Sequence, residues 1–198
     1  MMERLKKFVK SILTYTFNFH NIVRFKQFGK NSYIGRHCTT HFSREGEITI
    51  GSNVRFGNNA RFSIYGKGAQ IIIEDGVYAG TNISIITADT VKIEKNVLLA
   101  SYISIMGHNH GMNPESEENY GRQPLLGAPV CIKEGAWIGE QVCILPGVTI
   151  GKKAIIGSGS IVTKNIPDYA IAAGNPARVL KQYNFQTHEW KKAYETDV

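Results

Sequence analysis

Residues 132–162 read IKEGAWIGEQVCILPGVTIGKKAIIGSGSIV and carry an aliphatic residue at every sixth position. The periodic residues are Ile132, Ile138, Ile144, Ile150, Ile156 and Val162. Four places after each of the first five stands a small or β-branched residue: Ala136, Val142, Val148, Ala154 and Ser160. An α-helix has a hydrophobic period of about 3.6 and a half-buried strand one of about 2, so neither explains this spacing.

Earlier parts of the chain repeat the same unit in runs of three. The runs are Ile50, Phe56 and Phe62; Ile73, Ala79 and Ile85; and Ile93, Leu99 and Ile105. Three units of six residues close a triangular coil of 18 residues, in which the periodic side chains point inward and stack on the next coil. The sequence therefore predicts an all-β parallel solenoid that continues to about residue 166.

The composition is typical of a globular protein and excludes several classes. The chain has 198 residues, of which 42% are hydrophobic and 20% charged, so a disordered protein is excluded and one domain is expected. No apolar run is long enough for a transmembrane helix. The formal net charge of +7 favours an anionic partner. The basic residues are spread over turns rather than aligned with aromatic residues, so we expect no nucleic-acid partner.

Three segments organise the chain. Residues 1–28 resemble a basic amphipathic helix, with Leu5, Phe8 and Ile12 at helical spacing. We expect this helix to dock on protein, and peripheral contact with an anionic membrane is the alternative. The solenoid domain occupies residues 29–182, and a tail follows over 183–198, with a short helix expected around 184–195. Three cysteines, Cys38, Cys131 and Cys143, make an odd number that indicates a reducing, cytoplasmic setting.

The repeat stops between Ile105 and Val130 and predicts an excursion loop over residues 107–129. The loop is rich in Gly, Pro, Asn and acidic residues and opens with His108 and His110. Long loops on rigid scaffolds often carry function. An imidazole titrates near neutral pH, so either histidine could act as the general base that accepts a hydroxyl proton.

Beyond the repeat itself, two stretches carry a resemblance to a known family. Residues 93–114, IEKNVLLASYISIMGHNHGMNP, and residues 136–181, AWIGEQVCILPGVTIGKKAIIGSGSIVTKNIPDYAIAAGNPARVLK, resemble the hexapeptide-repeat acetyltransferases of the maltose, galactoside and xenobiotic type. The resemblance implies a left-handed parallel β-helix and homotrimers with active sites between neighbouring subunits. It also implies transfer of an acetyl group from acetyl-CoA, as co-substrate, to a hydroxyl in a ternary complex.

The resemblance also assigns catalytic and acceptor residues. Counted without gaps from Ile93, the family's catalytic histidine falls on His110, and His108 is the second candidate, which hydrogen-bonds to His110 or contacts substrate. Asn113 stands where the family has an acid and is a candidate substrate-binding residue. Asn82 and Asp89 partly match acceptor-binding positions, although such residues are also common turn formers. A sugar in a polysaccharide or its precursor is the expected acceptor.

The cofactor positions follow from the second stretch. They are Trp137, Glu140, Ser158, Thr163, Lys164, Arg178 and Lys181. The cations would hold the phosphates of coenzyme A. Glu140 stands where the family more often has Ser, and its backbone amide is expected to bind the carbonyl oxygen as that oxygen becomes negative.

Other functions remain open at this point. N-acetylation of an amino sugar, action on a xenobiotic and a non-catalytic scaffold use the same fold. Carbonic anhydrases of the gamma type also have this fold and bind zinc through three histidines, for which His37, His41, His108 and His110 are candidates. The paired spacing of that family is missing, so no metal is expected. Cys131 and Cys143 each precede an inward position and are expected to be inert.

Overall fold

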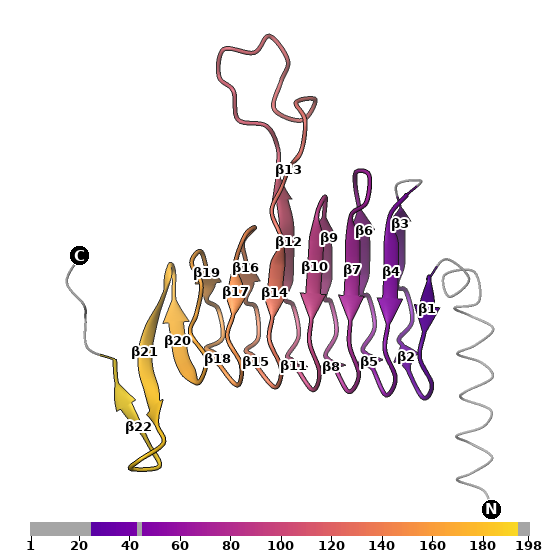
Figure 1. Cartoon of the computed structure of the whole chain (residues 1–198). Helices are drawn as coiled ribbons and strands as arrows, with labels where there is room; N and C mark the ends of the chain where they lie inside the picture. The colour runs from indigo at the N-terminus through magenta and orange to yellow at the C-terminus, as the bar shows by residue number, and fades with distance from the viewer. Residues whose placement is uncertain (1–24, 43–44, 194–198) are drawn as a thin grey trace, which may run out of the picture.

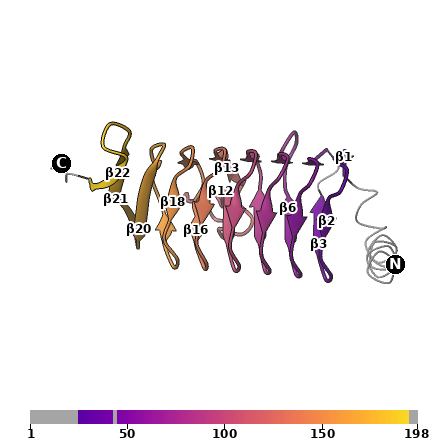
Figure 2. The ribbon, with the colours of Figure 1, turned by 90° about the horizontal axis from the view of Figure 1, so that it is seen from below.

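The computed structural model describes residues 25–42 and 45–193, and every regular element within these ranges is a β-strand. The strands form a parallel solenoid of three sheets (Figure 1). Figure 2 shows the coils stacked in a row along one axis. Residues 1–24 of the helix predicted for residues 1–28 lie outside the described residues, and at the end of that segment Gln27–Phe28 form a β-strand of the solenoid instead. Among the described residues, no helix could span a membrane.

Each coil contributes one strand to each sheet in turn. Sheet 1 contains, in spatial order, β1 (Gln27–Phe28), β4 (Glu47–Ile50), β7 (Gln70–Ile73), β10 (Thr90–Ile93), β14 (Val130–Ile132) and β17 (Thr149–Ile150). Sheet 2 contains β2 (Tyr33–Ile34), β5 (Arg55–Phe56), β8 (Tyr78–Ala79), β11 (Leu98–Leu99), β15 (Trp137–Ile138), β18 (Ile155–Ile156), β20 (Ala170–Gly174), β21 (Ala177–Asn184) and β22 (Glu189–Lys192). Sheet 3 contains β3 (Thr39–Phe42), β6 (Arg61–Ile64), β9 (Ser84–Thr87), β12 (Ser104–Asn109), β16 (Cys143–Ile144) and β19 (Ile161–Val162), and β13 (Leu126–Gly127) pairs with β12.

The periodic residues form the core, as the sequence predicts. Ile132 pairs with Ile150, Ile138 with Ile156 and Ile144 with Val162, in coils of 18 residues. All six periodic residues of this stretch are at most 1% exposed, and so are the aromatic members Phe56 and Phe62 of the earlier runs. Inward stacking of these side chains in consecutive coils fills the triangular interior.

The register is continuous across the excursion loop. Ile93 of β10 pairs with Ile132, Leu99 of β11 with Ile138, and Ile105 of β12 with Ile144. The coils before and after the loop are therefore direct neighbours. The loop leaves the solenoid as a separate arm that extends well beyond the other turns (Figure 1).

Corners of the coils require unusual backbone geometry. The corner between sheets 2 and 3, called here the far corner, carries residues with positive φ, including His37, Asn59 and Asn82 at 57°, 61° and 56°. Gly139 shows a second constraint at this corner, because a Cβ there would lie 2.6 Å from the backbone nitrogen of Ser158 in the next coil. The corner between sheets 3 and 1, from which the loop leaves, is called here the loop edge.

The C-terminal region differs from the prediction. Residues 184–195 were expected to be helical, but β21 and β22 form an antiparallel hairpin that extends sheet 2 from β20. Tyr183 pairs with Trp190 across the hairpin, with ring centroids 5.2 Å apart. Asn184 Oδ1 accepts hydrogen bonds from the amides of Gln186 and Thr187 and closes the turn. Pairing with the open edge of sheet 2 overrides the local helical composition.

Candidate active site

The two loop histidines lie where β12 leaves the solenoid. β12 is the longest strand of sheet 3, and β13 returns antiparallel to it, with His108 opposite Gly127 and Asn109 opposite Leu126. His108 therefore lies on a paired strand, and His110 follows directly after the strand ends. The structure thus holds both imidazoles at the root of the arm on the loop edge.

His108 is a half-buried imidazole with an unpaired nitrogen. Its Nδ1 atom is buried and has no hydrogen-bond partner. Burial, and next the charge of a protonated His110, lower the pKa of His108 below its usual value. His108 is therefore neutral at neutral pH.

His110 is exposed and lies beside His108. The two ring centroids are 6.2 Å apart, and the ring planes meet at 72°. The next residue, Gly111, is buried, and a Cβ there would lie 2.7 Å from Cβ of Gln123. The backbone after His110 is therefore pressed against Gln123, which fixes where the imidazole emerges.

Gln123 organises the base of the arm, and the sequence analysis missed it. Its side chain is only 6% exposed. Its Oε1 accepts from the Asn113 amide at 3.0 Å, and its Nε2 donates to the carbonyls of Asn113 and Glu118 at 2.9 and 3.1 Å. A single Gln in a polar loop has no spacing that could predict this role. Asn113 itself uses Oδ1 to accept from the Glu115 amide, as a turn former does.

Asp89 shares the loop edge with the histidines. A Cβ on Gly127, the residue paired with His108, would lie 3.1 Å from Cβ of Asp89. Oδ1 of Asp89 accepts from the Thr90 amide at 2.6 Å, and its own amide donates to Oγ1 of the buried Thr87. The predicted acceptor residue Asp89 is thus held close to His108.

Asn82 lies at the far corner instead. Its Oδ1 accepts from Nδ2 of Asn59 one coil earlier, and its Nδ2 donates to Oγ1 of Thr81, both at 3.2 Å. Ala88 lies at the level of His108, and it follows Asn82 by six residues, which at about 3.3 Å each is about 20 Å. One chain therefore does not bring Asn82 and the histidines together.

Three of the predicted cofactor residues gather at the far corner. The Glu140 amide donates to Oγ of Ser158 at 3.1 Å, so the amide expected to bind the carbonyl oxygen is engaged within the corner. Arg178 pairs with Ala173, and a Cβ on Gly157, next to Ser158, would lie 2.8 Å from Cβ of Ala173. Glu140 and Ser158 are therefore in direct contact, and the backbone of Arg178 lies at the same corner.

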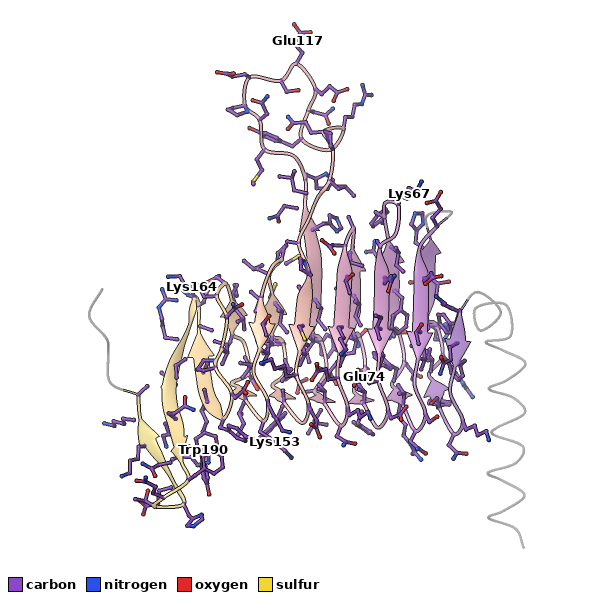
Figure 3. The ribbon with its side chains drawn as sticks, in the orientation of Figure 1. Lys67, Glu74, Glu117, Lys153, Lys164 and Trp190 are labelled. Atoms are coloured by element: carbon purple, nitrogen blue, oxygen red, sulfur yellow. The ribbon has the colours of Figure 1, made fainter. Side chains whose placement is uncertain are left out.

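The other predicted cofactor residues lie farther away. Trp137 is 49% exposed on sheet 2, and Lys181 lies on β21 opposite Ile171. Thr163 and Lys164 follow β19 and are exposed on the loop edge, where Figure 3 shows Lys164 on the same side of the solenoid as the arm. Within the described part of the chain, Lys164, Arg178 and Lys181 take part in none of the ion pairs.

The remaining candidates do not form a metal or thiol site. Among residues 25–42 and 45–193, no group of three His, Cys, Asp or Glu side chains is placed to hold a metal ion. His37 occupies a far-corner turn and His41 lies on β3. Burial raises the pKa of the thiols of Cys38, Cys131 and Cys143, so these cysteines are poor nucleophiles at neutral pH.

Comparison with known proteins places the chain in a family. Residues 132–164 match the family described as bacterial transferase hexapeptide (six repeats). Galactoside O-acetyltransferase of Escherichia coli (strain K12) is 37% identical over 150 residues, which are 75% of this chain and 71% of that protein. WbbJ of the same strain, provisionally named a lipopolysaccharide biosynthesis O-acetyl transferase, is 33% identical over 159 residues, which are 77% of this chain and 81% of that protein.

Solved structures agree with this placement. A maltose O-acetyltransferase from Clostridium difficile 630 is 28% identical, with a TM-score of 0.58 over 81% of this chain and 71% of that one. A variant of AntD, an N-acyltransferase from Bacillus cereus, solved with dTDP and coenzyme A, has a TM-score of 0.70 over 86% of this chain and 90% of its own. At 19% identity, this second likeness concerns the fold alone. The chain belongs to the hexapeptide-repeat acetyltransferase family.

Proposed function

We propose that the chain transfers an acetyl group from acetyl-CoA to a hydroxyl of a sugar. His110 removes the hydroxyl proton, the oxygen attacks the thioester carbon, and coenzyme A leaves as the thiol after it receives a proton. The observation that carries the proposal is the pair of imidazoles held at the root of the arm. His110 is exposed to an incoming acceptor, and the neutral His108 lies beside it.

The cationic residues suit the donor. Coenzyme A carries phosphates at one end, and Lys164, Arg178 and Lys181 are exposed cations outside the described ion pairs. The exposed ring of Trp137 offers an apolar surface for the pantetheine arm. These residues would bind and orient the donor, while its thioester supplies the acetyl group.

Direct transfer is favoured over a covalent intermediate. A cysteine nucleophile would need a lowered thiol pKa, and burial raises the pKa of all three cysteines. We therefore propose that donor and acceptor are bound together in a ternary complex.

The candidate site is divided between two corners of the solenoid, and this arrangement supports a homotrimer. His110 and Asp89 lie on the loop edge, whereas Glu140, Ser158 and Arg178 lie at the far corner, at the opposite end of sheet 3. We propose that the coils wind left-handed, as the family resemblance implies, and that the loop edge of one subunit faces the far corner of a neighbour. Each active site would then use residues of two copies.

A sugar of a polysaccharide or its precursor is the proposed acceptor, because the family relatives include galactoside O-acetyltransferase and WbbJ. N-acetylation is the second candidate. It is favoured by 39% identity over 62 residues, or 31% of this chain, to a dTDP-3-amino-3,6-dideoxy-α-D-galactopyranose 3-N-acetyltransferase from Aneurinibacillus thermoaerophilus. We propose a cytoplasmic location, and peripheral membrane contact through residues 1–28 stays a prediction outside the described residues.

Thiol release from acetyl-CoA tests the proposal against a panel of hydroxyl and amino sugars. We expect His110→Asn to lower kcat at least about 100-fold and His108→Asn to lower it less. His188→Asn, in an exposed turn of positive φ that Asn tolerates, is the matched control. Product that resists alkali would indicate an amide and the second candidate.

Two results would overturn these assignments. Full turnover in His110→Asn would remove that residue as the base. A wild-type protein that releases no thiol with any sugar of the panel would refute sugar acetylation.

A further inference from the structure

A row of rings runs along the loop edge away from His110. His41 of β3 and Tyr65, the first residue after β6, have ring centroids 5.0 Å apart. Tyr65 and His108 follow at 5.7 Å, and His108 and His110 at 6.2 Å. The mechanism above uses only the last two of these rings.

Tyr65 and His108, the middle pair of rings in the row, lie on either side of the small residue Ala88. Ile64 pairs with Thr87 and Thr87 with Gly107, so Tyr65, Ala88 and His108 occupy one level in three successive coils. Neighbouring strands lie about 4.8 Å apart, which puts the backbones of Tyr65 and His108 about 10 Å apart. Their ring centroids are closer than that, so the two rings lean toward each other over Ala88.

In a single subunit the row is open to a ligand, and in the proposed trimer it would line the interface between two subunits. His41 and His110 at its two ends are exposed, and Tyr65 and His108 between them are half-buried. Ring planes meet at 36° for His41 and Tyr65 and at 71° for Tyr65 and His108, so the row presents both faces and edges. Such a surface combines apolar ring faces with hydrogen-bonding nitrogen and hydroxyl groups.

The charged side chains next to the row disfavour a ligand that carries phosphate. Asp89 adds a carboxylate beside the strand pair that holds His108. Lys67, on the turn after Tyr65, pairs with Glu45 at 3.7 Å. A neutral ligand with an apolar face and many hydroxyls, such as a pyranose ring, therefore fits better than a sugar diphosphate.

We propose that the row formed by His41, Tyr65 and His108 is a second acceptor subsite, which holds the sugar ring next to the one that is acetylated. This inference rests on the proposed function and deepens it. The acceptor is then an oligosaccharide or polysaccharide that lies along the loop edge, with its reacting unit at His110 and its chain directed toward the first coil.

The test compares sugars of increasing length in two readouts. The probes are glucose, galactose and N-acetylglucosamine and the di-, tri- and tetrasaccharides of each. One readout is kcat/KM from thiol release with acetyl-CoA. The other is calorimetric binding of the same sugars to the full-length protein without acetyl-CoA.

Three variants test how the ring and the hydroxyl of Tyr65 contribute to sugar binding. Tyr65→Ala removes the central ring, Tyr65→Phe keeps the ring without the hydroxyl, and Lys67→Ala is the surface control two residues away on the same turn. We expect the ratio of tetrasaccharide to monosaccharide kcat/KM to fall about five- to tenfold in Tyr65→Ala, as for loss of one ring contact. In Tyr65→Phe the ratio should stay within about twofold, and in Lys67→Ala it should not change.

The outcomes distinguish this inference from the proposed function. Length-dependent binding that requires Tyr65, without acetyl transfer, would support the subsite and refute the function. Acetyl transfer with no oligosaccharide preferred over its monosaccharide would refute the subsite alone. An equal loss on all lengths in Tyr65→Ala, or a preference for nucleotide-linked sugars, would also overturn it.

Discussion

Replacement of Gln123 by Met should loosen the arm without unfolding the solenoid. The change keeps the length of the side chain and removes hydrogen bonds of 2.9, 3.0 and 3.1 Å to the backbone of Asn113 and Glu118. Each such bond contributes about 1 kcal/mol net, so the closed arm should lose about 2 to 4 kcal/mol. That loss corresponds to an opening equilibrium raised about 30- to 1000-fold. The core has no contact with these bonds, so the thermal midpoint should shift little.

Hydrogen exchange followed by mass spectrometry measures this effect in peptides that cover residues 111–123. The Asn113 amide, which donates to Gln123, should exchange much faster in the variant, while β9 and β16 keep their protection. Because His110 precedes this segment directly, kcat should fall at least about tenfold. Gln186→Met, in an exposed turn, is the matched control. Unchanged exchange at residues 111–123 would refute the assigned role of Gln123.

Three further substitutions test the packing around Phe62 and Gly107 and the lowered pKa of His108. Phe62→Ala should lower the free energy of unfolding by about 3 to 5 kcal/mol in urea denaturation, because this ring is fully buried; a loss under about 1 kcal/mol would contradict the packing. Gly107→Ala should destabilise by about 1 to 3 kcal/mol, because its Cβ would overlap Oγ1 of Thr87, and an unchanged thermal midpoint would exclude that contact. Since the folded pKa of His108 lies below 6.5, the unfolded chain binds more protons, and stability should fall as the pH drops through 6.5 and below. His108→Gln should make this fall shallower, and identical stability profiles would argue against the lowered pKa.

The core was predictable because the solenoid is encoded by local spacing. Each inward position is set by its place in a unit of six, so Ile132 through Val162 could be assigned without knowledge of any distant contact. The hairpin of β21 and β22 could not be assigned in this way. Its composition permits a helix, and only the open edge of β20 decides for strands.

Positions in the candidate site could be predicted where a residue is tied to a break in the repeat. The break marked His108 and His110, which the structure places side by side. The role of Gln123 depends on how the arm folds back on itself, and Tyr65 contacts His108 across Ala88, two coils apart along the sheet. Neither contact has a signature in the spacing of the chain.

The unbroken register beneath the arm has an evolutionary consequence. Ile93, Leu99 and Ile105 stack on Ile132, Ile138 and Ile144 as if nothing were inserted. The packing of the core therefore does not depend on the length or composition of the arm. Natural selection can lengthen, shorten or exchange it while folding proceeds as before. The surroundings of His110 at the root of the arm can therefore diverge rapidly between descendants of one ancestor, while the stacked coils change slowly.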